Sequence, residues 1–316
     1  MYTHGFRAMN TQFHIWLDAQ APEAKQALQR AEAFVRHVEA LVSRFRPDSV
    51  LSRVNRAPGQ WHTVPPLVAA LIREALHWAR VTQGWFDPTV LPALQAVGYT
   101  CSFDQLPARG TVICNPPGER AHTGGWQGIQ LEGERLYIPP GTGLDLGGIA
   151  KEWVADRLAE QLAVWGPCLV DAGGDIRAVG KPALWGTWPV GVAHPLADDV
   201  DVVRLGLHDA GLATSSRTRR RWRVGSQEMH HLINPHTGQP AQTRVLSASV
   251  VAPTAVMAGI GSKLALMCQT TQADVLKVVQ PQGVILVFED GYIDFWWEEN
   301  RVAASTYPNH TPNTAV

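Results

Sequence analysis

The sequence is short of lysine and cysteine and contains no long hydrophobic run. Lysine supplies five of the 27 basic residues, so each lysine inside a motif is of interest. The four cysteines lack the C-x-x-C spacing of a zinc site or a redox pair, and we expect reduced thiols. No segment reaches the ~20 apolar residues of a membrane-spanning helix, and the first residues do not resemble a secretion signal. We therefore expect a cytoplasmic protein with no membrane insertion.

An excess of charge of either sign is also absent. The net charge is -1 and the pI is near 6.9, so no overall field attracts nucleic acid or a membrane surface. What the chain does contain is apolar material. Hydrophobic residues make up 45% of the sequence and charged residues 17%, which predicts a globular protein with a large core.

Hydrophobic periodicity predicts four helices. A long amphipathic helix spans Glu23 to Phe45 and carries Phe45 on its apolar face, and a second helix follows Pro65 and ends at Gly84. A third begins after Gly148, and a fourth covers roughly Ala255 to Cys268.

Short strand-like runs fill most of the remaining chain. Because they mix irregularly with the helices, the pattern favours an α+β fold over a doubly wound one. A polar tail follows Asn300, and we expect it to be frayed. The expected strands are Gln12 to Leu17, short strands within Gly128 to Ile138, Cys168 to Val170, Ile176 to Val179, Trp188 to Val192, Val202 to Leu207, Leu246 to Val251 and a closing hairpin that turns at Asp290 and Gly291.

Two glycine-containing segments are candidates for anion binding. Asp145 to Lys151 joins a strand end to a helix through two glycines, which exposes backbone N–H groups and a helix amino terminus, and Lys151 could neutralise charge there. The alternative is an ordinary tight turn before a helix. Asp171 to Asp175 repeats the theme between two strands, where a simple hairpin turn is the other interpretation.

Histidines and arginines gather in two further segments. Adjacent residues on a strand point to opposite faces, so His230 and His231 are poorly placed to bind one metal ion, and at most one of them faces a cleft as an acid or base. The run from Thr214 to Arg223 is the only dense basic patch. It is interpreted as a solvated strand edge or a small-anion site, or else as an RNA-binding surface in which Trp222 stacks on a base.

Eight segments in a fixed order, extending across nearly the whole chain, indicate a function most clearly. They are Met9 to Thr11, Ser43 to Ser49 with Leu51 and Ser52, Gly84 to Val90, Asp145 to Lys151, Ala172 to Ile176, Ala213 to Ser215, His231 to Pro235 with Thr237 and Gly238, and Val250 to Ala255. Taken together, these segments resemble the ApbE family, the FAD:protein FMN transferases.

The resemblance implies a T-fold-like α+β architecture, with a single domain over residues 1–300 and a polar tail over 301–316. It also implies a reaction in which a Thr or Ser hydroxyl of an acceptor protein attacks the FMN-side phosphorus of FAD and AMP leaves. His231 matches a family histidine linked to activity, and its role as proton acceptor is our hypothesis. The FAD-contacting positions fall on Met9, Phe45 (in place of the usual tyrosine), Trp85, Phe86, Asp87, Asp145, Lys151 and Ile233.

The sequence departs from the family at the magnesium site. The resemblance implies one ligand from the backbone carbonyl of Gly148 and two from an Asp and a Thr four residues apart on a later helix. Gly259 and Lys263 stand at those two positions, so both side-chain ligands are missing, and an ammonium group would repel the ion. We predict that Lys263 replaces the metal as a fixed positive charge. Asn234, where the family usually has Asp, is a milder change because Asn also supports a turn.

Other functions stay open at this point. A homologue that binds FAD without transferring FMN, or that hydrolyses FAD to release AMP, fits the loss of the metal ligands. An RNA-binding protein built on the arginine run requires a strongly salt-dependent affinity, which the near-neutral charge does not favour. The partners we expect are FAD and an acceptor protein, and no nucleic acid. The sequence identifies neither the acceptor nor the oligomeric state.

Overall fold

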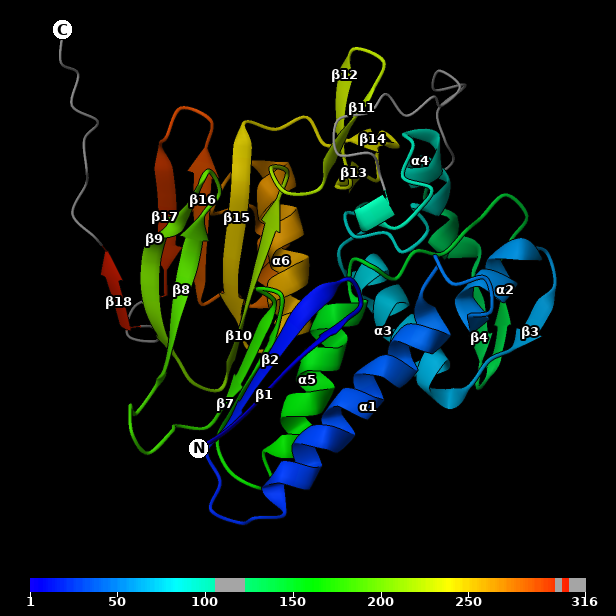
Figure 1. Ribbon diagram of the computed structural model, residues 1–316. Helices are drawn as coiled ribbons and strands as arrows, with labels where there is room; N and C mark the ends of the chain where they lie inside the picture. The colour runs from blue at the N-terminus through cyan, green and yellow to red at the C-terminus, as the bar shows by residue number, and fades with distance from the viewer. Residues whose placement is uncertain (106–122, 299–302, 307–316) are drawn as a thin grey trace, which may run out of the picture.

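An eight-stranded sheet forms the centre of the protein (Figure 1). The computed structural model describes residues 1–105, 123–298 and 303–306. Neighbouring strands of the sheet are antiparallel, in the order β1-β2-β6-β7-β10-β15-β16-β17. Together with the helices described next, this sheet confirms the α+β prediction. The strands are β1 (Tyr2–Ala8), β2 (Thr11–Leu17), β6 (Cys168–Ala172), β7 (Ile176–Val179), β10 (Ala210–Ser216), β15 (Val245–Ala252), β16 (Gly283–Phe288) and β17 (Ile293–Trp297).

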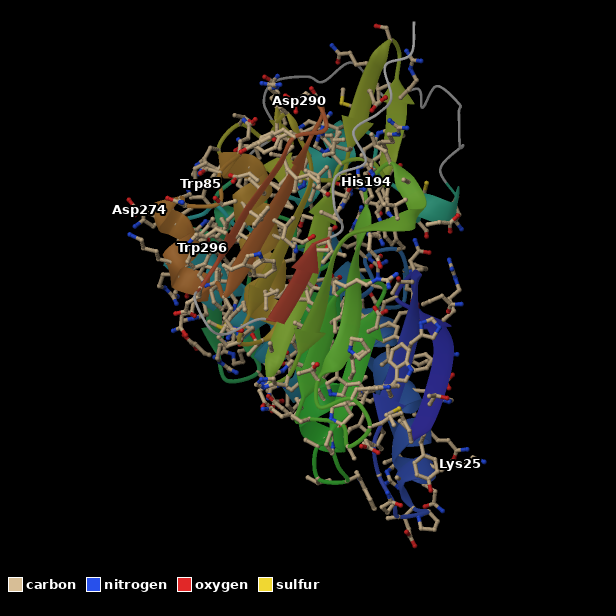
Figure 2. All side chains as sticks on the ribbon, turned by 90° about the vertical axis from the view of Figure 1, so that its left-hand side faces the viewer. Lys25, Trp85, His194, Asp274, Asp290 and Trp296 are labelled. Carbon is tan, nitrogen blue, oxygen red and sulfur yellow. The ribbon has the colours of Figure 1, made fainter. Side chains whose placement is uncertain are left out.

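Helices cover one face of this sheet, and a small sheet covers the other (Figure 1). Helix α5 (Ala150–Leu162) packs on β6 and β7, α6 (Ala255–Cys268) packs on β10 and β15, and α1 (Ala24–Val42) contacts β1 and α5. The small sheet consists of β8 (Trp188–His194), β9 (Ala197–Leu207) and β18 (Ala303–Thr306). Figure 2 views the molecule from the side of this small sheet, with His194 at the end of β8 and Trp296 in β17.

Strand alternation divides the buried residues of the large sheet between two cores, one on each of its faces. In β6, Cys168 and Val170 lie in the core under the helices, whereas Leu169 lies in the core shared with β8 and β9. In β10, Ala213 and Leu212 divide in the same way. Because both faces are covered, successive residues of these strands are apolar instead of alternating with polar ones.

The remaining elements of the described chain lie outside the large sheet and the β18-β9-β8 sheet. The helices are α2 (Val50–Arg56), α3 (Pro66–Val81) and α4 (Leu91–Ala96), with short 3-10 turns at Phe103–Gln105, Gly125–Gly128 and Asp274–Val279. The strands are β3 (Trp61–Thr63), β4 (Gln130–Glu132) and β5 (Arg135–Tyr137), which form one small sheet, and the pairs β11 (Arg221–Val224) with β12 (Gln227–His230) and β13 (Ile233–Asn234) with β14 (Gln239–Pro240).

The four helices predicted from periodicity correspond to α1, α3, α5 and α6, but the end of the first is wrong. Helix α1 ends at Val42 because Ser43 adopts an extended backbone (φ -71°, ψ 119°). Phe45 therefore lies in a loop and not on the apolar face of the helix. The structure also adds β1, α2 and α4, which the hydrophobic pattern did not reveal.

The carboxyl-terminal segment differs from the expected frayed tail at four residues. Ala303–Thr306 form β18, which pairs with β9 from Ala303 opposite Gly206 to Thr306 opposite Val203. Residues 299–302 and 307–316 lie outside the described residues, and the single domain over residues 1–300 stays a prediction.

The thiols and helices can be compared with two further expectations. Cys101, Cys168 and Cys268 are free thiols, in agreement with the prediction, while Cys114 lies outside the described residues. Within the described ranges, no helix combines the length and the apolar character needed to cross a lipid bilayer.

Candidate active site

A cleft of about 820 Å³ brings together segments that are far apart in the sequence. Its lining comes from the β1–β2 turn, the loops after α1 and α3, the first turn of α5, the β6–β7 turn, the segment after β10 and one side of α6. This cleft is lined by every residue that the sequence analysis proposed for the site: Met9, Phe45, Trp85, Phe86, Asp87, Asp145, Gly148, Lys151, His231, Ile233 and Lys263. Their individual roles stay predictions.

The tight turn between β1 and β2 carries Met9 to the cleft. Met9 and Asn10 both have positive φ values (50° and 58°), and Ala8 pairs with Thr11, as in the two-residue turns that suit hairpins. A left-handed backbone is unfavourable for methionine. The Met9 N–H donates to a carboxylate oxygen of Glu39 in α1 (2.8 Å), which helps to hold this conformation and ties the turn to the helix.

Three aromatic side chains, Phe45, Trp85 and Tyr99, form what we call the aromatic wall of the cleft. The Phe45 and Tyr99 rings lie 5.7 Å apart at 57°, and the Arg44 guanidinium lies over both, 4.1 Å and 4.6 Å from their centroids. Trp85 contacts His236 edge to face at 4.6 Å. Phe45 is 37% exposed, so part of its surface is available to a planar ligand.

Two predicted FAD-contacting carboxylates are engaged within the protein. Asp145 accepts a hydrogen bond from the Gly147 N–H (2.7 Å) and forms an ion pair with Arg44 Nε (2.5 Å). Asp87 accepts from the backbone and hydroxyl of Thr89 and from the Gly124 N–H, and it is buried. These bonds give both carboxylates a part in holding the loops of the cleft, whatever they contact in a ligand.

Lys151, Glu152 and Lys263 form what we call the charged wall of the same cleft, which His231 also lines. Lys151 pairs with Asp175 of the β6–β7 turn. Burial alone would lower the pKa of Lys151, but the charges of Asp175 and Glu152 raise the pKa above its ordinary value, so the ammonium stays protonated.

Lys263 reaches back along α6 toward the amino end of α5. Its Nζ donates to the carboxylate of Glu152 and to the carbonyl oxygen of Gly259, each at 2.9 Å. The side chain passes close to Gly148: a Cβ built on that glycine would lie 3.5 Å from Lys263 Cε. Lys263 therefore lies beside two of the three positions that the resemblance assigned to magnesium.

His231 follows directly after β12, and burial lowers its pKa to about 3, with a further contribution from the positive charge of Arg220. Its Nδ1 lies 3.3 Å from the carbonyl oxygen of Arg220. A carbonyl can only accept, so Nδ1 carries the proton and Nε2 keeps a lone pair. His230 bonds instead to the carbonyl of Ala241 (3.1 Å) and does not line the cleft, which agrees with one histidine of the pair facing it.

The arginine run does not form an RNA-stacking surface. Trp222 is 4% exposed, donates to the carbonyl of Val97 (2.7 Å) and stacks on Tyr99, so the proposed contact with a base is wrong. Arg217 pairs with Glu289. Arg219 and Arg220 line the cleft. Arg219 also borders a second cavity, of about 550 Å³, between the large sheet and β8.

The residues present do not fit a magnesium ion. Gly259 offers no side-chain oxygen, and its carbonyl oxygen accepts from the Lys263 ammonium. In the described part of the chain no group of three or more His, Cys, Asp or Glu side chains is arranged to hold a metal. A magnesium ion requires several oxygen ligands and is repelled by an ammonium group, so the surroundings of Lys263 do not suit it. The loss of the ion's side-chain ligands stays a prediction.

Sequence reasoning gave no role to three residues whose contacts hold the walls of the cleft. Arg44 stood inside a recognised segment without a role, and Tyr99 belonged to none. Glu152 directly follows the recognised Lys151, but only the packing of α5 on α6 brings it to Lys263. The Asn234 prediction holds: its backbone carbonyl accepts from Thr237 and Gly238 and its side chain from the His236 N–H, so the turn persists.

Comparison with known proteins identifies the family. The model of the ApbE family matches residues 9–288, which include all eleven predicted site residues. The chain belongs to the ApbE family.

Two bacterial FAD:protein FMN transferases are similar to it over most of their length. The FAD:protein FMN transferase of Haemophilus influenzae is 28% identical over 270 residues, covering 80% of this chain and 76% of that protein. The FAD:protein FMN transferase of Salmonella typhimurium is 27% identical over 290 residues, covering 85% and 79%.

Solved ApbE structures share the fold. The ApbE protein of Thermotoga maritima superposes with a TM-score of 0.79 at 25% identity, covering 93% of this chain and 96% of that one. The flavin transferase ApbE from Vibrio cholerae gives a TM-score of 0.74 at 24% identity, covering 94% and 97%. The predicted T-fold-like ApbE architecture is therefore confirmed.

Proposed function

We propose that this chain is an FAD:protein FMN transferase. The acceptor hydroxyl oxygen forms a bond to the FMN-side phosphorus of FAD, the bond from that phosphorus to the bridging oxygen breaks, and AMP leaves with that oxygen. The hydroxyl proton passes to a base. The observation that carries the proposal is the single cleft in which all eleven predicted site residues meet, in a chain of the ApbE family.

The aromatic wall suits the flavin end of FAD. An isoalloxazine ring can stack on Phe45, whose ring is partly exposed, and replacing a tyrosine by phenylalanine at this position keeps the stacking surface. Arg44 sits over Phe45 and Tyr99 and is paired with Asp145, so the wall is braced before a ligand binds. A site held in place in this way loses less entropy on binding.

The charged wall suits the pyrophosphate. Cleavage develops negative charge on the transferring phosphoryl group and on AMP, and positioned cations dominate its stabilisation. Lys263 is the candidate for the positive charge that the ApbE resemblance assigns to a magnesium ion. Further cations are Lys151 and the cleft-lining Arg219 and Arg220. No step of this mechanism passes through magnesium.

His231 is the candidate proton acceptor. With Nδ1–H donated to Arg220, its Nε2 lone pair is free to accept the hydroxyl proton. A pKa of about 3 makes this imidazole neutral at pH 7 but a weak base. Such a base suits a loose transition state, in which the bond from phosphorus to the AMP oxygen is largely broken before the hydroxyl proton leaves.

Incubation of the purified chain with FAD tests the proposal. We expect AMP release, measured by chromatography, that is equal with magnesium and with EDTA, and covalent in-gel flavin fluorescence on a protein of the source organism's lysate. AMP and FMN without labelled protein would indicate FAD hydrolysis. Bound FAD with no AMP would indicate a silent homologue. A strong magnesium requirement, or full activity of Lys263→Ala, would overturn the proposed role of Lys263.

The expected partners and cellular location remain predictions from the sequence. The acceptor protein is expected as a partner and nucleic acid is not, and a cytoplasmic location stays a prediction. In-gel flavin fluorescence of fractionated cells would test the location of the labelled acceptor.

A further inference from the structure

A buried carboxylate, that of Glu152, contacts Lys263, and none of the sequence motifs includes it. Glu152 is in the first turn of α5, and its side chain is 3% exposed. The amino end of a helix favours a negative charge. One carboxylate oxygen, Oε1, accepts from Lys263 Nζ at 2.9 Å, and the other, Oε2, is buried without a hydrogen-bond partner in the described part of the chain.

Gly259 provides the space for this carboxylate. A Cβ built on Gly259 would lie 2.5 Å from Glu152 Oε1 and 2.7 Å from its Cγ, closer than real atoms approach. Glycine is unfavourable in the interior of a helix, so its presence in α6 calls for a reason. The reason here is steric, because any side chain at position 259 would displace Glu152.

Hydrogen bonds one helical turn from Glu152 fix how α5 packs against α6. Asp156, four residues after Glu152 on the same face of α5, accepts from the Ala255 and Val256 N–H groups at the start of α6, at 2.8 Å and 3.0 Å. Thr254 caps the same end by accepting from the Met257 N–H. These bonds set the amino end of α6 against α5, so Glu152 is held opposite Gly259.

The arrangement leaves Lys263 with a defined direction. An ammonium group has three donors, and two of them are committed to Glu152 and to the Gly259 carbonyl. The third donor is left for a ligand oxygen in the cleft that Lys263 lines. A flexible lysine without these two acceptors would spread its charge over many rotamers.

We propose that Glu152 is a positioning residue for FMN transfer: from α5, in the space opened by Gly259, it holds the Lys263 ammonium beside Gly148. This inference rests on the proposed function. The ApbE resemblance implies a carboxylate on the later helix that binds a metal ion. In this chain the carboxylate comes from α5, and it binds the ammonium group of Lys263.

The test is a double-mutant cycle of Glu152→Gln, Lys263→Gln and the double variant, with Glu160→Gln as matched control. Glu160 lies on the same helix but is 60% exposed and pairs only with Arg157 among the described residues. Three quantities are measured: the AMP-release rate at saturating FAD, and the dissociation constants of FAD and of riboflavin, from flavin fluorescence.

We expect Glu152→Gln to slow AMP release about 10-fold or more, Lys263→Gln to slow it further, and the double variant to be no slower than Lys263→Gln, since coupled residues are not additive. Riboflavin affinity should stay unchanged, because riboflavin has no phosphate. Rates that multiply in the double variant, or a Glu152→Gln rate equal to that of Glu160→Gln, would overturn the inference.

Two further outcomes are separable. If Glu152→Gln does not fold, Glu152→Leu/Lys263→Met removes both charges without leaving one unpaired and should fold and bind riboflavin but lose AMP release; wild-type rates in this variant would overturn the inference. If the wild type itself releases no AMP, the proposed function fails. The cycle is then read from the FAD affinity relative to riboflavin, which Glu152→Gln lowers if the ammonium is positioned by Glu152 and leaves unchanged if it is not.

Discussion

Phe45 and Lys263 both stand where the ApbE resemblance implies a different residue, yet the two walls of the cleft accommodate them differently. In the aromatic wall, Phe45 keeps the ring, and Arg44 and Tyr99 contact it. In the charged wall, Lys263 requires Glu152, and Glu152 requires Gly259. An apolar replacement is local, whereas a buried charge needs a partner and that partner needs space.

The largest expected effect comes from a substitution that disrupts the charged wall. Gly259→Asp introduces a side chain into the volume of Glu152 and places two carboxylates together, so we expect the free energy of unfolding to fall by about 3 kcal/mol or more. Urea denaturation measures the change. Gly259→Asp/Glu152→Ala should recover much of the loss. Gly133→Asp, at a glycine with open space around it, should cost only about 1 kcal/mol, because its φ of +61° is unfavourable for any side chain. A single variant as stable as the wild type would refute the coupling.

The next effect concerns His231 and pH. Its folded pKa of about 3 lies below the ordinary value of 6.5, so the unfolded chain binds a proton first as the pH falls. This contribution to stability is complete above pH 6.5 and is lost toward pH 3, by about 2 kcal/mol between pH 7 and pH 5. Urea denaturation at both pH values should show a smaller loss in His231→Asn. An equal loss in the two proteins would place the titration elsewhere.

A smaller effect, on FAD affinity, is expected from substitutions in the aromatic wall. Phe45→Ala removes a stacking surface worth about 1 kcal/mol, so the dissociation constant of FAD should rise about 5-fold to 10-fold, measured by quenching of flavin fluorescence. Phe45→Tyr is the control and should change it by less than about 2-fold, because the ring is kept. A larger effect of Phe45→Tyr than of Phe45→Ala would mean that this wall is as coupled as the charged one.

The smallest effect lies at the rim. Arg219 is exposed, so Arg219→Ala should weaken FAD binding about 2-fold to 5-fold at low salt and hardly at all at high salt, where exposed charges are screened. Arg221→Ala is the matched control, because Arg221 pairs with Glu228 on the β11–β12 hairpin. A salt-independent loss in Arg219→Ala would show that this arginine binds FAD in a desolvated position.

Local patterns predicted the helices better than they predicted where those helices end. The apolar stripe of α1 is a property of the sequence itself, but its end at Val42 depends on Ser43 turning the chain so that Phe45 faces the cleft. Strand β1 was missed because its residues are mostly polar or exposed and it is held by pairing with β2. Trp222 was misinterpreted because its burial against Tyr99 and Val97 depends on residues more than 100 positions away.

By itself, the sequence determined the ApbE motifs, the residues that gather in one cleft and the occurrence of Gly259 and Lys263 four residues apart, because each of these is a matter of residue type and order. Only the tertiary structure decided what surrounds these two residues. Glu152 is 107 residues before Gly259 in the chain, and no periodicity links them. Their contact exists because Asp156 ties α5 to the start of α6 and brings a carboxylate into the space that a missing side chain leaves.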